Sequence, residues 1–223
     1  MTDLTILYLT LNKLPEGWMA YHKKVLLEAV GDTPIITISK KPMDWGINIL
    51  QTEPESLSNI YWQMLKAGKI ATTPFVAIVE DDTLYSKEHF AFRDPTAFSY
   101  NMTHWSLFTW GEPTYSWRDR TGNYSMISSR QLMIDALEER FAKWPNGTPK
   151  DITGELGRDR VNRNLGLSKR KLVEYFTTIG IVNFNHDYSE EEYQRTHVKR
   201  MGPLRAYDIP FWGKASELVK NFK

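Results

Sequence analysis

Short apolar runs alternate with segments of helical periodicity along the first 80 residues of the chain. Three runs rich in β-branched residues, 4–10, 35–39 and 75–79, predict strands that are covered on both faces. Apolar positions at helical spacing predict one helix after Pro15 and another over about 56–69. Because strands alternate with helices, we expect a largely parallel sheet with right-handed crossovers.

The first predicted helix divides clearly into an apolar and a polar side. Its apolar positions are expected to face the core: Met19, Leu26, Leu27 and Val30. His22 and the two lysines that follow it are expected to face solvent.

The pattern is weaker in the second half of the chain. Residues 98–126 are rich in Trp, Tyr, Thr and Ser and predict strands or long loops, and capping-box spacing at 128–131 opens a helix. The run Trp-Pro-Asn-Gly-Thr-Pro at 144–149 breaks that helix and is the best candidate boundary. We therefore expect an α/β core over 1–149 and a C-terminal extension over 150–223 that packs on the same domain.

The predicted extension is basic, with 14 Lys and Arg against 10 Asp and Glu. It contains a short, strand-like apolar run at 179–182 and an acidic-then-basic helix from near Ser189. From Ala206 onward we expect a tail that packs on the domain.

Composition is that of an ordinary globular protein. The 223 residues fit one domain, and the net charge of +1 does not by itself indicate a polyanionic partner. The absence of Cys excludes disulfides and cysteine nucleophiles and fits a reducing compartment. No apolar stretch approaches the ~20 residues of a membrane span, and the first residues carry an acid rather than a basic segment. We therefore expect a cytoplasmic protein without membrane contact.

Three consecutive carboxylates, Glu80, Asp81 and Asp82, follow the third predicted strand directly. In open α/β sheets, ligands bind beyond the carboxyl ends of the strands. Clustered carboxylates repel one another, and Mg²⁺ or Mn²⁺ relieves that repulsion while leaving coordination positions for nucleotide phosphates. The alternative is an acidic turn that caps the next helix, although one acid is enough for a cap.

This order of strands and helices, with an acidic triplet near residue 80, resembles the A-type (GT-A) fold of glycosyltransferases, of the family-2-like kind. The resemblance covers roughly residues 4–90. It implies a single Rossmann-like domain, in which 1–149 bind a nucleotide-sugar, with UDP-sugar as the first choice of donor. It also implies that Asp82 is the direct metal ligand and that Asp81 and Glu80 orient the ribose, the sugar or the waters of the metal.

The same resemblance suggests donor contacts at other strand ends. Thr10, Leu11 and Asn12, at the end of the first predicted strand, would contact the base of the nucleotide. Asp44 or Asn48 would lie near the ribose.

The family often adds a histidine from the C-terminal part to the metal shell. His186 follows the strand-like run at 179–182, where such a ligand is expected. His104 and His197 are the competing histidines, and His197 falls in the helix expected to be solvated.

An inverting glycosyltransferase needs a carboxylate base for the acceptor hydroxyl. Glu155 lies in a Gly-flanked loop on the supposed acceptor side and is the first candidate, with Asp159 and Asp119 behind it. The alternative is that Glu155 is a loop acid without a role. Arg158, from the basic segment after this loop, is a candidate for binding the diphosphate of the donor.

The acceptor is suggested by the basic segments 158–171 and 195–205, which could follow a phosphate backbone. Interleaved tyrosines and phenylalanines could stack on a flipped base. These features resemble compact viral enzymes that glycosylate hydroxymethylated pyrimidines in phage DNA. A saccharide acceptor is the alternative.

Two other classes of protein remain as rivals. A sugar-phosphate nucleotidyltransferase shares the topology, but the turn 11–15 lacks the glycines of a phosphate loop. A non-catalytic module that binds nucleic acid or carbohydrate would use the acidic triplet only as a cap. A Gly-x-Ser-x-Gly motif and a P-loop are both absent.

Overall fold

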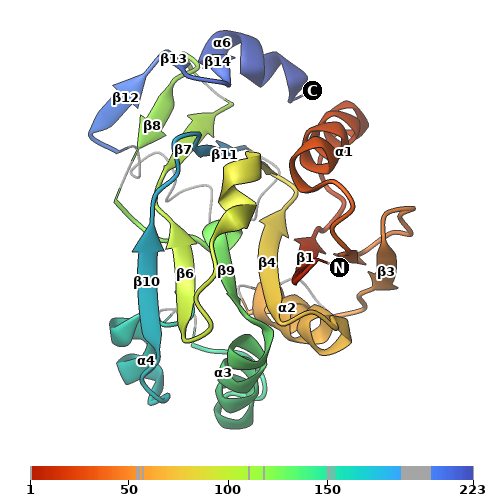
Figure 1. The fold of residues 1–223 in the computed structure, drawn as a ribbon, viewed down its shortest axis with the longest axis vertical. Helices are drawn as coiled ribbons and strands as arrows, with labels where there is room; N and C mark the ends of the chain where they lie inside the picture. Colours follow the sequence, from red (N-terminus) through yellow and green to blue (C-terminus); the bar gives the residue numbers. More distant parts are fainter. Residues whose placement is uncertain are drawn as a thin grey trace.

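A computed structural model describes residues 2–53, 56, 58–109, 111–117, 119–149, 152, 154–186 and 202–222 of the chain. Within these residues, the largest sheet has seven strands in the order β10-β6-β9-β4-β1-β2-β3 (Figure 1). The strands of this sheet are β1 (Leu4–Leu9), β2 (Ile35–Ser39), β3 (Ile47–Leu50), β4 (Phe75–Glu80), β6 (Ala97–Asn101), β9 (Met126–Ser129) and β10 (Lys171–Tyr175). All neighbouring strands run parallel except for β9, which is antiparallel to β4 and to β6.

A second sheet of the described residues has the order β12-β8-β7-β11-β5. Its strands are β5 (Thr83–Leu84), β7 (His104–Phe108), β8 (Tyr115–Trp117), β11 (Ile181–Asn185) and β12 (Leu204–Ala206), and a small hairpin of β13 (Asp208–Ile209) and β14 (Gly213–Lys214) follows. The two-residue strand β5 leaves the end of β4 and pairs antiparallel with β11. This pairing connects the two sheets next to the acidic turn.

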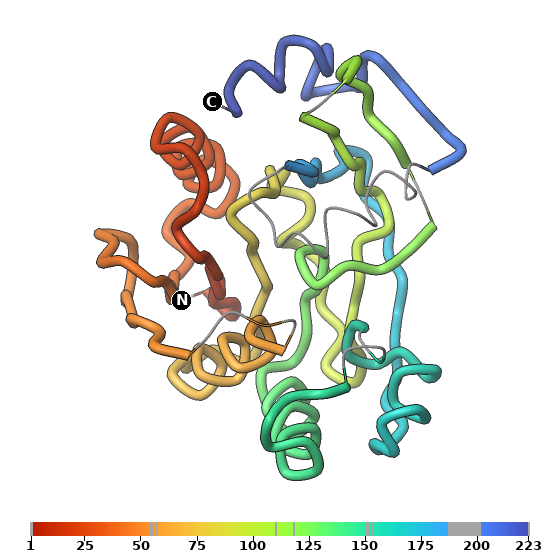
Figure 2. Tube along the Cα trace, turned by 180° about the vertical axis from the view of Figure 1, so that it is seen from behind, coloured from red at the N-terminus to blue at the C-terminus, as the bar shows by residue number. Residues whose placement is uncertain are grey.

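The helices flank the sheets on different sides. They are α1 (Glu16–Val30), α2 (Asn59–Ile70), α3 (Arg130–Lys143), α4 (Asp159–Leu165) and α6 (Ala215–Leu218), with 3-10 turns η1 (Lys87–Ala91), η2 (Asn123–Ser125) and η4 (Val219–Asn221). Figures 1 and 2 show α2 beside α3 at one end of the molecule and the C-terminal segment beside α1 at the other. Among the described residues, no helix is both long and apolar enough to cross a membrane.

Side chains alternate across β1 and build a core on each face of the large sheet. Leu7 and Leu9 pack in a cluster with α2 and α3, whereas Ile6 and Tyr8 pack in a second cluster that includes Leu26 of α1. A third cluster fills the space between α1, the second sheet and the C-terminal segment, around Trp18. Strands covered on both faces are therefore continuous apolar runs in the sequence.

The α/β class expected from the sequence is confirmed, with a mostly parallel central sheet flanked by helices. The three runs expected to be strands form β1, β2 and β4. Strands from both sides of position 149 share the large sheet, because β10 pairs with β6. The helix expected near Ser189 lies outside the described residues.

The expected orientation of α1 is wrong at two positions. His22 is buried rather than solvated, and Leu27 is 40% exposed rather than in the core. Burial lowers the pKa of His22 to about 4, so the ring is neutral near pH 7. Its Nε2 lies 2.8 Å from the Thr83 carbonyl oxygen, so this contact satisfies one of the two ring nitrogens.

The crossover between β2 and β3 depends on a glycine. Gly46 has φ +63°, and an added Cβ would lie 2.1 Å from the Ile35 carbonyl oxygen. Gly31, after α1, also has a positive φ of +56° but has no atom within 4 Å of the added Cβ. We expect Gly31→Ala to cost only the roughly 1–3 kcal/mol of a strained main-chain conformation, and Gly46→Ala to cost clearly more because it adds a clash with main chain. Urea unfolding of both variants measures the difference, and equal losses would contradict the steric account.

Candidate active site

The predicted acidic turn lies where β1 and β4 end side by side. The two strands are parallel, with Leu9 opposite Glu80, so Thr10 and Asp81 leave the sheet as neighbours. The Thr10 hydroxyl donates a 2.5 Å hydrogen bond to the Asp81 carboxylate. A pocket of about 200 Å³ opens at this edge, lined by Leu9, Thr10, Leu11, Lys13, Leu14, Ser56, Asn59, Ile60, Gln63, Glu80, Asp81, Asp82 and His186.

Asp82 is held by the C-terminal half of the chain. Its carbonyl oxygen accepts a 2.8 Å bond from the Phe184 amide, and its carboxylate oxygen Oδ1 accepts a 3.0 Å bond from the Asn183 side chain. The other carboxylate oxygen, Oδ2, lies 3.6 Å from Nε2 of His186. Residues about 100 positions apart in the sequence therefore meet at one edge of the pocket.

The carboxylates of the acidic turn are electrostatically strained. Burial raises the pKa of Glu80 well above its usual range, and the neighbouring Asp82 and Asp81 charges add to the effect. Burial, followed by the Asp82 charge, raises the pKa of Asp81 to about 7, although the Thr10 hydrogen bond opposes the shift. A bound cation would offset this clustering of negative charge.

The side chains present fit a hard divalent cation with few protein ligands. Among the described residues, no three His, Asp or Glu side chains form a complete metal cluster. Asp82 and His186 nevertheless face each other. The neighbouring carboxyl groups of Glu80 and Asp81 both have raised pKa values. Mg²⁺ and Mn²⁺ sites commonly use one or two protein ligands and complete their shell with water and substrate phosphates.

Only some of the residues expected to contact the nucleotide base and the ribose lie at the pocket. Thr10 and Leu11 line the pocket. Asn12, in contrast, uses its side-chain oxygen to accept bonds from the amides of residues 40 and 41. Asn48 bonds to Met43, Thr37 and Ser39, and Asp44 is exposed and does not line the pocket.

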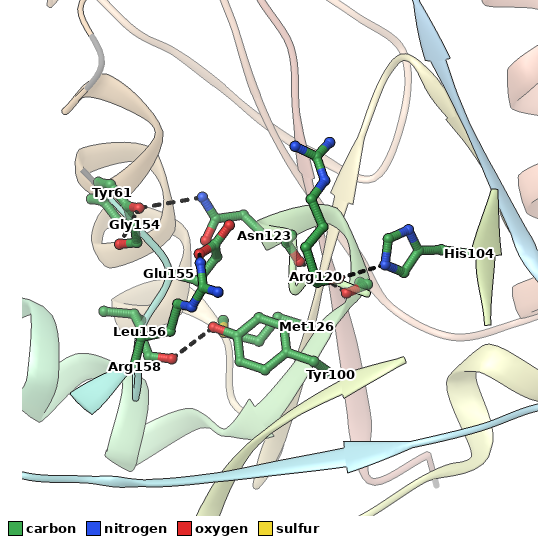
Figure 3. A network of polar contacts seen from close by, with 12 residues as sticks. Tyr61, Tyr100, His104, Arg120, Asn123, Met126, Gly154, Glu155, Leu156 and Arg158 are labelled. Carbon is green, nitrogen blue, oxygen red and sulfur yellow. Dashed lines mark hydrogen bonds and ion pairs between the residues drawn. The ribbon is translucent and has the colours of Figure 1, made fainter. Parts of the chain in front are cut away.

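The Gly-flanked loop brings Glu155 near enough to Glu80 for their charges to interact, although neither Glu155 nor Arg158 lines the pocket. Its side chain is 17% exposed and pairs with Arg158 at 3.0 Å. The Glu155 charge contributes to the raised pKa of Glu80, after burial and the two aspartates, and Arg120 opposes that rise. Figure 3 shows the Glu155 carboxylate beside Asn123 and Arg158, with the Arg120 side chain on the other side of Asn123.

The remaining sequence candidates lie elsewhere. The Asp159 side chain is 55% exposed in the first turn of α4 and lies 3.7 Å from Lys169. Asp119 is exposed. His104 is buried between the Arg120 carbonyl oxygen and the Tyr124 hydroxyl, so both of its ring nitrogens have partners. His197 lies outside the described residues.

Sequence reasoning missed several residues at the site. Asn183, which bonds to Asp82, lies three positions before His186 in the run Asn-Phe-Asn-His. Asn59 and Gln63 of α2 line the pocket, and both donate hydrogen bonds to Gln51, which in turn bonds to the Thr10 carbonyl oxygen. In the sequence, only the adjacent Asn and His at 185–186 indicated polar residues at this site. The side-chain amides of Asn59 and Gln63 have the pattern of ordinary polar positions on a helix.

A larger cavity of about 1120 Å³ lies near the start of β1, lined mainly by apolar side chains of α1, η1 and the C-terminal segment. None of the predicted site residues lines it. The smaller pocket is the better candidate because it combines strand ends with carboxylates whose pKa values are perturbed.

The sequence matches no family model and no curated protein. The fold is similar to that of the mannosyltransferase PcManGT from Pyrobaculum calidifontis, solved in complex with GDP-Man and Mn²⁺, with a TM-score of 0.51 and 12% identity. The match covers 89% of this chain and 60% of the mannosyltransferase. This chain therefore spans about 60% of the length of that protein, and the similarity confirms the Rossmann-like α/β fold.

Two further structures are more distant. A glycosyltransferase involved in the glycosylation of the major capsid of PBCV-1 has a TM-score of 0.48 and 10% identity, covering 88% of this chain and 98% of its own. A nucleotidyl transferase from Methanothermobacter thermautotroptrophicus has a TM-score of 0.44 and 14% identity, with the same coverage.

From the raised pKa of Asp81 we predict how the free energy of unfolding depends on pH when no metal is bound. Between about pH 4 and pH 7 the unfolded chain has released the Asp81 proton while the folded chain retains it. The free energy of unfolding therefore falls as pH rises through this window, by up to about 4 kcal/mol. We expect Asp81→Asn to remove this loss, so the variant gains stability over the wild type as pH rises.

Urea unfolding in EDTA at pH 4, 5.5 and 7 measures that difference. Asp32→Asn, at the exposed end of α1, is the matched control and should follow the wild type at each pH. A constant difference between Asp81→Asn and the wild type across the three pH values would contradict the prediction.

Proposed function

We propose that this chain transfers a sugar from a nucleotide-sugar to an acceptor hydroxyl with the help of a divalent cation. The observation that carries the proposal is the meeting of Asp82 and His186 at the carboxyl ends of β1 and β4. A fold shared with a mannosyltransferase that binds GDP-Man and Mn²⁺ supports it. Asp82 and His186 are the proposed cation ligands, and a bound cation would stabilise the negative charge of the leaving diphosphate.

The pocket beside these ligands suits the nucleoside part of the donor. Leu11, Leu14 and Ile60 supply apolar surface, and the amides of Asn59 and Gln63 supply polar groups. We propose Thr10 and Leu11 as the strand-end contacts of the base and retain UDP-sugar as the first donor to test.

Glu155 is the proposed catalytic base. It would take the proton of the acceptor hydroxyl while that oxygen attacks the anomeric carbon and the bond from that carbon to the diphosphate oxygen breaks. Direct displacement of this kind inverts the anomeric centre. The Glu155–Arg158 pair places a cation beside the base, and Arg158 is the proposed contact for the diphosphate.

The acceptor is best treated as a choice between DNA and saccharide. Of the six basic residues in 158–171, four form ion pairs within the protein, with Glu155, Asp159, Glu139 and Asp94. Such pairing leaves less positive charge for a phosphate backbone than the sequence suggests. Residues 195–201 of the second basic segment lie outside the described residues. We keep hydroxymethylated pyrimidines in DNA as one arm of the acceptor assay and oligosaccharides as the other.

The first test is a thermal-shift panel of UDP, GDP, CMP and their sugar conjugates, each with and without Mn²⁺. A ligand at about 100 times its Kd stabilises the folded state by about 2.7 kcal/mol, or roughly 5–10 °C in Tm for a chain of this size. We expect one nucleotide to give such a rise only with Mn²⁺. Asp82→Asn and His186→Ala should abolish the rise, and Asp32→Asn should keep it. A flat panel for the wild type would favour the non-catalytic binding module.

A second test distinguishes Glu155 from Asp159 as the catalytic base. With the donor identified, Glu155→Gln should lower kcat by about 10²–10⁴-fold, because it removes the proton acceptor. Asp159→Asn should leave kcat near the wild-type value, since its side chain is exposed and faces Lys169. The reverse order of effects would assign the base to Asp159 instead.

A further inference from the structure

The loop that carries Glu155 has a glycine on each side, and at both glycines the main-chain conformation and the close packing disfavour any other residue. Gly154 has φ +150°, and an added Cβ would lie 2.6 Å from the Val161 side chain. Gly157 has φ +83°, and an added Cβ would lie 2.9 Å from the Phe98 ring. The loop is therefore closely packed on both sides of Glu155 rather than projecting freely into solvent.

Two buried tyrosines hold the carbonyl groups on either side of Glu155 (Figure 3). The Tyr61 hydroxyl, from α2, donates a 2.7 Å hydrogen bond to the Gly154 carbonyl oxygen. The Tyr100 hydroxyl, from β6, donates a 2.8 Å bond to the Leu156 carbonyl oxygen. The residues before and after Glu155 are thus tied to two different elements of the core.

A buried cation reinforces the first of these contacts. Arg140 of α3 is 1% exposed, and its guanidinium lies 4.1 Å from the Tyr61 ring and 3.4 Å from the Gly154 carbonyl oxygen. No carboxylate among the described residues forms an ion pair with it. Within the described residues, an aromatic face and a carbonyl dipole lie against the guanidinium, and both favour a positive charge. The cation therefore stabilises this one arrangement of Tyr61 and Gly154.

We propose that Tyr61 and Tyr100 are positioning residues that place the Glu155 carboxylate by fixing the main chain on both sides of it. The inference rests on the proposed role of Glu155 as the base. Neither tyrosine lines the donor pocket, so each acts on the reaction through Glu155 and not through the nucleotide.

Tyr61→Phe and Tyr100→Phe each remove one hydroxyl and keep the ring. Each should lower kcat about tenfold, the effect of losing one well-formed hydrogen bond, and leave the KM for the donor unchanged. Tyr115→Phe is the matched control. The hydroxyl of this buried tyrosine donates a 3.0 Å hydrogen bond to the Gly213 carbonyl oxygen, far along the chain from the Glu155 loop, so the kcat of the variant should stay at the wild-type value.

The decisive measurement repeats both substitutions in Glu155→Gln. If the tyrosines act through Glu155, they should not lower the residual rate of Glu155→Gln any further. Tenfold losses that persist in that background, or losses matched by Tyr115→Phe, would overturn the positioning role while the proposed function stands. A wild type that transfers no sugar from any donor would overturn the proposed function instead, and hence the inference that rests on it.

Discussion

The antiparallel pairing of β5 with β11 is the constraint on which the candidate site depends. It brings Thr83 opposite Asn183, and it ties the Phe184 amide to the Asp82 carbonyl oxygen. Because β5 begins directly after the acidic turn, this short ladder fixes Asp82 against the end of β11 and so places His186 beside it. A site built this way holds two segments about 100 residues apart in one geometry, and neither can move without breaking main-chain hydrogen bonds.

The acidic turn is stabilised by its surroundings rather than by its own side chains. The Trp18 indole donates to the Asp81 carbonyl oxygen, the Tyr85 hydroxyl accepts from the Glu80 amide, and the Thr10 hydroxyl bonds to the Asp81 carboxylate. These contacts offset the cost of placing three carboxylates together, a cost seen in the raised pKa values of Glu80 and Asp81. Retaining such strain at a strand end is typical of sites that bind a charged ligand.

The sequence predicted the elements that are buried on both faces and missed those whose role depends on distant partners. β1, β2 and β4 are continuous apolar runs, and the acidic turn follows the last of them. β10, in contrast, is an edge strand that exposes Lys171 and Glu174, so it looked like a solvated basic segment. Asn12 was expected to contact the nucleotide base and His22 to face solvent, whereas both side chains bond to residues 28 and 61 positions away inside the fold. Local patterns cannot show such long-range partners.

The charges of the pocket also couple the binding of the proposed cation to the binding of the proposed nucleotide. Burial and mutual repulsion keep Glu80 protonated and Asp81 partly protonated near pH 7, and the negative field that remains at the acidic turn, with Glu155 nearby, repels a free diphosphate. A cation at Asp82 and His186 would reverse that field, so under the proposed function the nucleotide gains affinity from the cation. By thermodynamic reciprocity the cation gains the same factor from the nucleotide. If the two facing side chains that the described residues supply are the protein ligands, the site should bind the metal weakly alone and much more tightly as a metal–nucleotide pair. Under the proposed function, strong coupling between the cation and the nucleotide would therefore follow from the small number of protein ligands that the described residues place at the end of β4.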